Sequence, residues 1–371
     1  MAIVFVENSE HGNAPTSAYV WDSITGAPAI NSTTPIKGTY DIRVGRGSFF
    51  TDYMSLLSTG RLGTTTIVYL HFWYKLVTAP SAGNFERVCG IIATPNGGAL
   101  SLLVDEYARL YMGATFQLVI GQPVEVEFYA EVVPGTKTVH YAYWVNGTLI
   151  KAADSAFASN ETAIRSVIIG GESAAASKFV YDAYYDDIVV DTERRIGTGL
   201  TLETEVPNAD DATEDEWLAN DDATPPVTSY DNVNDNNVAT YAYSKPGSAD
   251  ATTQEQLWAF PATTATGTVL AVESRIAACY SLGGSVITHF HRIKLGATAI
   301  STNIVTGGAA EYFHFLRTTD PDGAAWTKAN ADNLLVGGQR GADANAYPMR
   351  ISDAWKTVVY RDPPKDWAPI I

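Results

Sequence analysis

The chain has 371 residues and a formal net charge of −17 at pH 7, and 46% of its residues are hydrophobic. This length exceeds what one hydrophobic core usually holds, so we expect two domains. The acidic charge argues against nucleic acid and anionic membranes as partners, because both bind clustered Lys and Arg. The opening residues, MAIVFVENSE, show no secretory signal, and no apolar run reaches the roughly 20 residues of a membrane helix.

Short strands without intervening amphipathic helices are predicted from residue 1 to about residue 192. The clearest is PVEVEFYAEVV, residues 123–133. Its alternation predicts an apolar inner face and an acidic outer face that carries Glu125, Glu127, Tyr129 and Glu131. Asn146–Gly147, between two such runs, predicts a hairpin because both residues accept positive φ. Strands at this spacing predict an antiparallel sandwich.

The stretch YDAYYDDIVV, residues 181–190, carries two adjacent aspartates, Asp186 and Asp187. Adjacent carboxylates can bind calcium, perform acid–base chemistry or mark a bent strand. The alternation slips at this pair, which favours a bulge in the strand that closes the first domain. Calcium binding by the pair is kept as the weaker alternative. We place the first domain at residues 1–195.

Residues 196–238 form an acidic stretch without Lys or Arg. This composition predicts a linker or surface loop, with Trp217 as an apolar anchor. Four oxygen-bearing residues there could hold calcium weakly, although their spacing does not match a calcium-binding loop: Asp231, Asn232, Asn234 and Asp235. A solvated loop is the favoured interpretation.

The strand pattern resumes in residues 239–371, which we predict to be a second β-sandwich with one short helix. A slip of alternation in TVLAVESRIAACY, residues 268–280, predicts a bulge or burial of both faces. Residues 320–323, DPDG, predict a turn. Thr327 is the expected N-cap of a helix over residues 329–335 that ends at Gly337 in the left-handed conformation.

Few residues suggest chemistry. Glu125, Glu127 and Glu131 could serve as catalytic carboxylates, but the charged face of an amphipathic strand predicts the same residues. His289 and His291 share one face of a strand, and His314 could lie on a neighbouring strand, which makes a weak zinc candidate. Cys89 and Cys279 are expected to be buried free thiols. We therefore expect no enzyme activity, no cofactor and no metal.

Several segments together give the first half a resemblance to a concanavalin A-like, laminin-G-type jelly roll: GTYDIRV, IVYLHFWYKL, ALSLLVDEYARLYM, VEVEFYAEV, HYAYWVNGTLI and YDAYYDDIVV. The second half resembles a module of structural proteins from tailed bacteriophages. Its marks are EDEWLANDDATPPVTSYDNVNDNN, TVLAVESRIAA and FHFLRTTDPDGAAWTKANADNLLVGGQR. The lectins of the jelly-roll family bind sugar through loops that hold calcium and manganese, and no such motif can be placed on this sequence.

These resemblances imply a non-enzymatic structural protein of a tailed-phage virion, a decoration or appendage on the capsid or the tail. Its expected partners are other virion proteins and further copies of itself, with host-surface glycan as a further partner. The alternative is a carbohydrate-binding adhesion module that attaches to a host surface. The expected location is the virion, after synthesis in the host cytoplasm.

Overall fold

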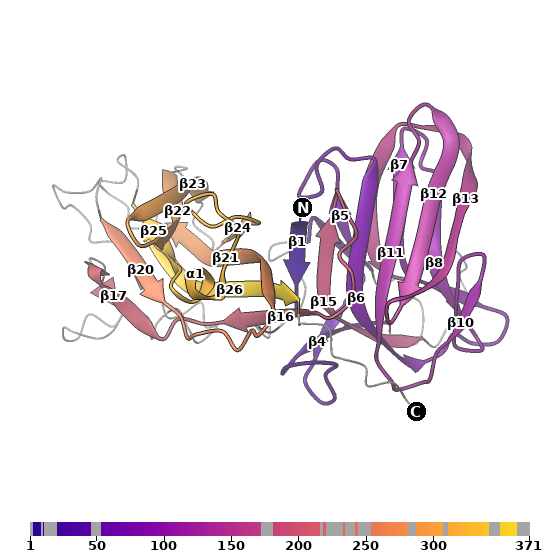
Figure 1. The fold of residues 1–371 in the computed structure, drawn as a ribbon, viewed down its shortest axis with the longest axis horizontal. Coiled ribbons are helices and arrows are strands. Elements are labelled where there is room, and N and C mark those ends of the chain that lie inside the picture. The colour runs from indigo at the N-terminus through magenta and orange to yellow at the C-terminus, as the bar shows by residue number, and fades with distance from the viewer. Residues whose placement is uncertain are drawn as a thin grey trace. The chain divides into compact units, whose positions relative to one another are not determined.

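The structure, a computed structural model, describes residues 3–8, 10, 21–45, 53–171, 181–215, 218–219, 233, 242–243, 254–280, 287–306, 311–340 and 349–361. The chain divides into two compact units, Met1–Leu200 and Thr201–Ile371. Each unit is built from two antiparallel sheets, and the second also carries one short helix within its described residues (Figure 1). The predicted all-β fold with two jelly-roll-like sandwiches is thereby confirmed.

The first unit contains an eight-stranded and a seven-stranded sheet. The strands of the larger sheet are β1 (Ile3–Glu7), β3 (Ala29–Asn31), β4 (Asp41–Val44), β6 (Ile67–Thr78), β11 (Val124–Val132), β12 (Thr136–Val145), β13 (Thr148–Glu161) and β15 (Asp182–Asp191). Those of the smaller sheet are β2 (Ser23–Thr25), β5 (Tyr53–Leu57), β7 (Phe85–Thr94), β8 (Ala99–Asp105), β9 (Arg109–Tyr111), β10 (Thr115–Gln117) and β14 (Ala163–Gly170). Their orders are β13-β12-β11-β6-β15-β4-β3, with β1 beside β15, and β10-β9-β8-β7-β14-β5-β2.

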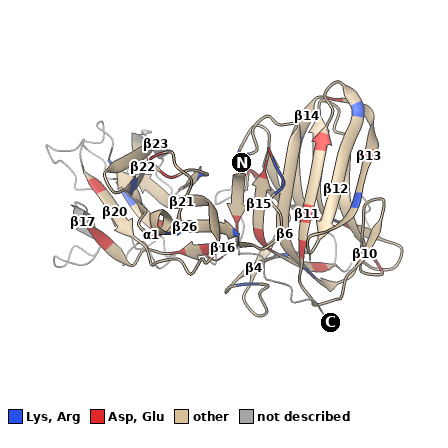
Figure 2. Ribbon diagram, viewed as in Figure 1, with Lys and Arg blue, Asp and Glu red and all other residues tan. Residues whose placement is uncertain are grey.

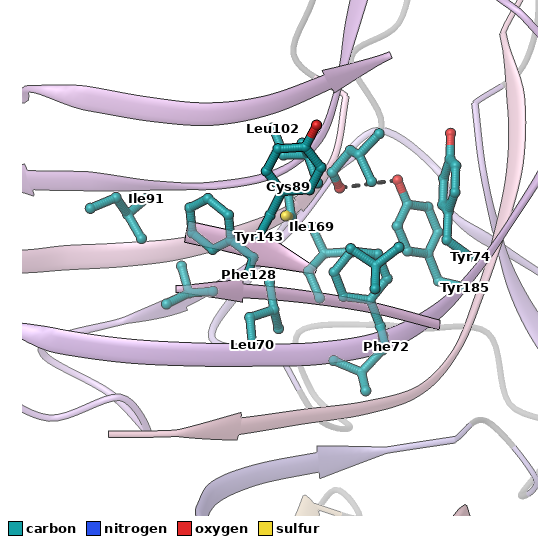
Figure 3. Packing of buried hydrophobic residues seen from close by; sticks show 14 of the residues in the cluster. Leu70, Phe72, Tyr74, Cys89, Ile91, Leu102, Phe128, Tyr143, Ile169 and Tyr185 are labelled. Atoms are coloured by element: carbon teal, nitrogen blue, oxygen red, sulfur yellow. Dashed lines mark hydrogen bonds between the residues drawn. The ribbon is translucent and has the colours of Figure 1, made fainter. Parts of the chain in front are cut away.

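The core of the first unit draws apolar side chains from both of these sheets (Figure 3). The predicted inner face of β11 is confirmed, since all of its alternating apolar residues are buried: Val124, Val126, Phe128, Ala130 and Val132. Among the aromatic residues, the ring centroids of Phe72 and Tyr185 lie 5.6 Å apart. The Tyr185 hydroxyl is satisfied inside the core because it donates to the carbonyl oxygen of Val88 at 3.0 Å.

The hairpin predicted at Asn146–Gly147 is confirmed. Val145 pairs with Thr148 across the turn that joins β12 to β13. Asn146 and Gly147 have φ values of 47° and 78°, which is the left-handed backbone that a two-residue hairpin turn requires. This local signal therefore fixes the pairing next to the turn, and the register shifts further along the two strands between Tyr143 and Trp144.

The second unit contains a six-stranded and a five-stranded sheet. The strands of the larger sheet are β16 (Leu200–Glu205), β18 (Leu218–Ala219), β19 (Ala242–Tyr243), β21 (Thr268–Tyr280), β24 (Glu311–Arg317) and β26 (Met349–Arg361). Those of the smaller sheet are β17 (Ala209–Asp215), β20 (Glu255–Ala259), β22 (Ile287–Leu295), β23 (Thr298–Thr306) and β25 (Leu335–Gln339). The orders are β18-β19-β26-β21-β24, with β16 beside β26, and β17-β20-β25-β22-β23.

The segment 196–238, predicted to be a linker, begins differently in the structure. Strands β16, β17 and β18 lie within it and pair with β26, β20 and β19 of the second unit. Backbone pairing with the strands of the second unit supplies the stability that this acidic composition lacks on its own. The second unit thus starts near residue 201 rather than at residue 239. The proposed anchor Trp217 lies outside the described residues.

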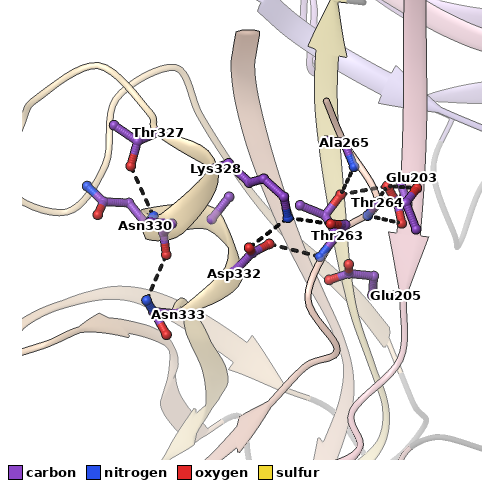
Figure 4. A network of polar contacts seen from close by, with 12 residues as sticks. Glu203, Glu205, Thr263, Thr264, Ala265, Thr327, Lys328, Asn330, Asp332 and Asn333 are labelled. Carbon is purple, nitrogen blue, oxygen red and sulfur yellow. Dashed lines mark hydrogen bonds and ion pairs between the residues drawn. The ribbon is translucent and has the colours of Figure 1, made fainter. Parts of the chain in front are cut away.

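The helix α1 (Lys328–Asp332) begins one residue before the predicted start at position 329, directly after the predicted N-cap (Figure 4). The Thr327 side-chain oxygen accepts a hydrogen bond from the backbone N–H of Asn330 at 3.1 Å, so the predicted N-cap is confirmed. The predicted DPDG turn is present as well, with the Gly323 N–H donating to the Asp320 carbonyl oxygen at 2.9 Å. No helix of the described ranges is long and apolar enough to cross a membrane.

The end of this helix differs from the prediction. It stops at Asp332, and Gly337 lies inside β25 rather than capping the helix. A Cβ atom at position 337 would come within 1.9 Å of the backbone oxygen of Gln256 on β20. The glycine is therefore used for close approach between two strands, which sequence spacing alone does not distinguish from a helix cap.

Two further predictions meet mixed outcomes. The bulge expected in residues 268–280 is confirmed, because the register of β21 with β26 shifts between Val269 and Ala271 and again between Ala277 and Ala278. Both cysteines are free thiols, but only Cys89 is fully buried; the other, at position 279, is half-buried beside the end of β21.

Candidate functional site

The adjacent carboxylates Asp186 and Asp187 lie at an irregularity in β15, as the broken alternation predicts. The register between β15 and β6 shifts between Asp186 and Val189. Asp187 has a φ of 46°, a left-handed conformation that aspartate tolerates better than most residues. Both aspartates are only 2% exposed. The predicted bulge in the closing strand is therefore confirmed.

Lys37 supplies the partners of these two carboxylates. Its ammonium donates to Oδ2 of Asp187 at 2.8 Å, and its backbone N–H donates to Oδ2 of Asp186 at 3.1 Å. The same ammonium lies 4.6 Å from the ring centroid of Trp73. Burial, and then the charge of Asp187, raise the pKa of Asp186. This arrangement joins the loop that carries Lys37 to the closing strand and uses the carboxylates structurally.

A metal ion at the aspartate pair was the weaker alternative. No group of three or more His, Cys, Asp or Glu side chains in the described part of the chain is arranged to hold a metal ion. The Asp187 carboxylate is instead in contact with the Lys37 ammonium. The other calcium candidates, Asp231, Asn232, Asn234 and Asp235, lie outside the described residues.

Glu125, expected on a solvent-facing surface, is buried instead. Its Oε1 atom lies 2.8 Å from Nε2 of His71 and accepts the backbone N–H of Gly199 at 2.9 Å. Burial by itself would raise the pKa of Glu125. The hydrogen bond and charge of His71, together with backbone N–H groups, have the larger combined effect, so the pKa lies below the ordinary value. The chain that leaves the first unit covers this carboxylate.

Glu127 holds the same exit segment. Its Oε2 atom contacts Nε of Arg195 at 2.6 Å, and its Oε1 atom accepts the backbone N–H of Gly197 at 2.7 Å. Arg195 also lies 4.2 Å from the ring centroid of Trp144. The outer face of β11 is therefore acidic as predicted, but the exit segment covers Glu125 and Glu127. The third glutamate considered for catalysis, Glu131, is half-buried near the other end of the strand.

An exposed aromatic surface lies on the seven-stranded sheet. Three aromatic side chains are exposed among the described residues, namely Phe85 (56%), Tyr107 (63%) and Tyr111 (43%). They belong to β7, to the turn between β8 and β9, and to β9. We call these three residues the aromatic surface. A contiguous exposed patch of large apolar side chains marks a contact site more often than scattered exposed side chains do.

Asp105 and Arg109 tie the aromatic surface together. Asp105 pairs with Phe85 across β7 and β8, and its Oδ1 atom accepts the backbone N–H of Tyr107 at 2.9 Å. Its Oδ2 atom accepts Nε of Arg109 at 2.7 Å, and the Arg109 guanidinium lies 4.9 Å from the Tyr107 ring centroid. Burial by itself would raise the pKa of Asp105. Its hydrogen bonds have the larger combined effect, so the pKa lies below the ordinary value. The Arg109 guanidinium is thus held by Asp105 against the exposed ring of Tyr107.

The histidine candidates of the second unit face the interior. His289 and His291 are 0% and 1% exposed on β22. His291 Nε2 lies 3.1 Å from Oγ of Ser274 on β21. Burial, and then the charge of Arg340, lower the pKa of His289 to about 4. Burial, and then the charge of His314, lower the pKa of His291 to about 3. These values describe neutral imidazoles in a sandwich core.

His314 does not lie on a strand next to these two histidines, so that expectation was wrong. It belongs to β24 in the six-stranded sheet, while β22 belongs to the five-stranded one. Its Nδ1 atom contacts Oε1 of Glu273 at 3.2 Å. Strand membership depends on pairings that a single sequence does not reveal.

Sequence reasoning missed the aromatic surface. Its residues lie in ALSLLVDEYARLYMG and in GNFERV, two segments that also contribute apolar residues to the core, so the sequence alone does not separate exposed rings from buried ones. The turn at Asp105, with two flanking tyrosines, was the signal that could have identified it. Only the pairing of β7, β8 and β9 decides which rings face outward.

Comparison with known proteins gives only distant likenesses. No family profile and no curated protein matches the chain. Cellulose induced protein Cip1 is similar over 47% of this chain and 88% of that one, at 19% identity and a TM-score of 0.36. The alginate lyase Aly36B is similar over 52% of this chain and 97% of that one, at 12% identity and a TM-score of 0.35. The tandem CBM22-1–CBM22-2 domain of Paenibacillus barcinonensis Xyn10C is similar over 96% of this chain and 97% of that one, at 12% identity and a TM-score of 0.29. At these TM-scores the likenesses carry no argument.

Proposed function

We propose that the first unit is a carbohydrate-binding β-sandwich that contacts glycans through the aromatic surface of Phe85, Tyr107 and Tyr111. The observation that carries this proposal is that all three exposed aromatic side chains of the described residues belong to one sheet, on β7, on β9 and in the turn before β9. Aromatic rings stack against the C–H faces of sugars, while nearby polar groups fix orientation. The exposed guanidinium of Arg109, 4.9 Å from the Tyr107 ring centroid, supplies such a group.

The test measures binding to a panel of soluble and insoluble polysaccharides by affinity electrophoresis and pull-down. Tyr107→Ala and Tyr111→Ala should each weaken binding about two- to tenfold, since an aromatic contact contributes about 0.5–1.5 kcal/mol beyond its area. Leu149→Ala is the matched control, because Leu149 is 52% exposed on β13 of the other sheet. Absence of binding to every glycan, or aromatic variants that bind like the unaltered chain, would contradict the proposal.

The role is proposed to be non-enzymatic. Two of the three glutamates considered for catalysis are occupied by the protein's own groups: Glu125 by His71 and Gly199, and Glu127 by Arg195 and Gly197. Both oxygens of Glu127 and the Oε1 atom of Glu125 therefore already have partners within the protein, whereas a catalytic carboxylate must reach the glycosidic bond. Release of reducing sugar from a bound polysaccharide would refute this part.

A place on the surface of a tailed-phage virion is a second proposal, and it rests on the sequence resemblance of residues 199–362. One unit would dock to the particle while the other faces its surroundings, and many copies would add avidity. Mass spectrometry of purified virions tests this role, and absence of the protein from the particle would end it. Light scattering of the purified chain tests the homo-oligomer expected on a symmetric particle.

A further inference from the structure

A second surface of the first unit combines tyrosine rings with carboxylates. Tyr69 and Tyr129 are opposite each other on β6 and β11, and their ring centroids lie 4.9 Å apart at an interplanar angle of 25°. Both stand on the face of the eight-stranded sheet that points away from the core and are half-buried. We refer to five residues together as the acidic tyrosine surface: Tyr69, Tyr129, Glu131, His140 and Asp154.

The polar members of this surface form a row across three strands. Glu131 on β11 is opposite His140 on β12, which is opposite Asp154 on β13. The Tyr129 hydroxyl donates to Oε2 of Glu131 at 2.5 Å, and His140 Nδ1 lies 2.6 Å from Oδ1 of Asp154. The row thus places the Glu131 carboxyl group beside the Tyr129 hydroxyl, and the exposed Asp154 lies two strands further along the sheet.

A third carboxyl group adjoins the ring pair with one oxygen unpartnered. Asp191 on β15 is opposite Tyr69, and it is 0% exposed. Its Oδ1 atom accepts the backbone N–H groups of Glu193 at 2.7 Å and Arg194 at 3.0 Å. Its Oδ2 atom is buried and has no hydrogen-bond partner. A buried acceptor without a donor is rare in a folded protein and calls for an explanation.

The electrostatic environment of the tyrosine pair is negative. Burial raises the pKa of Tyr69, and the charges that raise it further are those of Glu131, Asp191 and Glu127. The charge of Arg195 is already paired with Glu127. Strand β11 carries three glutamates and neither Lys nor Arg (Figure 2). A cation that approaches the rings is therefore attracted both by the carboxylates and by the ring faces.

We propose that the acidic tyrosine surface binds glycans that carry unacetylated amino sugars. The sugar ammonium pairs with Glu131, the half-buried carboxylate beside the rings, and the C–H face of the sugar packs on the tyrosine pair. The row of Glu131 and His140 presents acceptors for the hydroxyl groups of the sugar. Glycans that carry carboxylates, such as sialylated or uronic chains, are repelled. This site lies on the opposite sheet from the aromatic surface and does not depend on it.

The experiment titrates the full chain by calorimetry with a glucosamine tetrasaccharide and with its fully N-acetylated counterpart. The amino form should bind about five- to tenfold more tightly, because acetylation removes the charge that the carboxylates recognise. Glu131→Gln and Tyr69→Ala should each remove most of this preference, and 0.5 M salt should reduce it. Tyr111→Ala, on the aromatic surface, is the matched control and should leave it unchanged.

Several results would overturn the inference. Equal affinity for the amino and acetylated sugars, no binding of either, or a preference that survives Glu131→Gln would each do so. Equal binding of tetralysine would show general attraction of cations rather than a glycan site. Loss of the preference in Tyr111→Ala would move the amino-sugar site to the aromatic surface. Hydrogen exchange of β6 and β11 in each variant establishes that the sheet is intact.

Discussion

The imidazole Nε2 atom of His71 lies 2.8 Å from Oε1 of Glu125, and both side chains are buried beneath the chain that leaves the first unit. A carboxylate in this position joins β6 and β11 to residues 199 and 200 through one atom. The pair therefore links the closure of the sandwich to the start of the second unit along the chain.

Removal of the Glu125 carboxylate should loosen this link. Glu125→Ala leaves His71 and two backbone N–H groups buried without their acceptor, which typically costs about 3–5 kcal/mol. Hydrogen exchange of β6 and β11 peptides measures the loss for the first unit alone. Glu131→Ala on the same strand is the control, expected within about 0.5 kcal/mol of the unaltered chain because Glu131 is partly exposed.

The same carboxylate predicts a response to acid. The pKa of Glu125 in the folded protein is lowered from the ordinary 4.5. Its stabilising contribution is therefore present above the unfolded pKa and is lost as the pH falls through the lower, folded value. The difference in stability between the unaltered chain and Glu125→Ala should shrink below about pH 4.5. A difference that stays constant from pH 7 down to pH 3 would contradict this assignment.

Glu86 predicts the opposite pH dependence. It is 6% exposed, and burial raises its pKa from 4.5 to about 7, although the N–H and charge of Arg87 act against the shift. The folded state therefore prefers the protonated carboxyl, and its stability falls as the pH rises from 4.5 to about 7.

Glu86→Gln should remove this pH dependence. The variant is expected to match the unaltered chain near pH 4 and to exceed it at pH 8 by up to about 3 kcal/mol. Urea unfolding at the two pH values, followed by hydrogen exchange of β7 peptides, measures the difference. Glu311→Gln removes the same charge from an exposed position and should show no such gain. Equal stabilities of the Glu86 variant and the unaltered chain at pH 8 would refute the prediction.

The buried pair of Lys356 and Glu205 is the corresponding test in the second unit. Nζ of Lys356 lies 2.8 Å from Oε2 of Glu205 and donates to the carbonyl oxygen of Ala331 at 2.9 Å. Burial lowers the pKa of the lysine and raises that of the glutamate, in each case against the attraction of the partner. The pair is thus held together at a substantial cost of desolvation.

Lys356→Met should destabilise the second unit by about 3–5 kcal/mol, because it leaves the Glu205 carboxylate buried alone. The double variant Lys356→Met with Glu205→Leu should recover most of that loss, since two apolar groups need no partners. Hydrogen exchange of β26 peptides reports on this unit. A double variant no more stable than the single one would show that the two side chains do not act as a pair.

The sequence alone determined the features that depend on neighbours along the chain. The alternation of β11, the Asn146–Gly147 turn, the Thr327 cap and the bulge at Asp186 all follow from local backbone preference and from burial of one face of a strand. These were predicted correctly because a few adjacent residues carry the whole cause. The all-β fold followed from their repetition.

Only the tertiary structure decided what depends on pairing between distant strands. It placed Gly337 in a strand against Gln256 rather than at a helix end, and it put His291 and His314 on different sheets. It also turned Phe85 and Tyr111 outward and brought the Glu125 carboxylate under the exit segment. A strand pattern gives each side chain one of two faces, but which sheet lies behind that face, and what covers the other, is fixed by contacts far apart in the sequence.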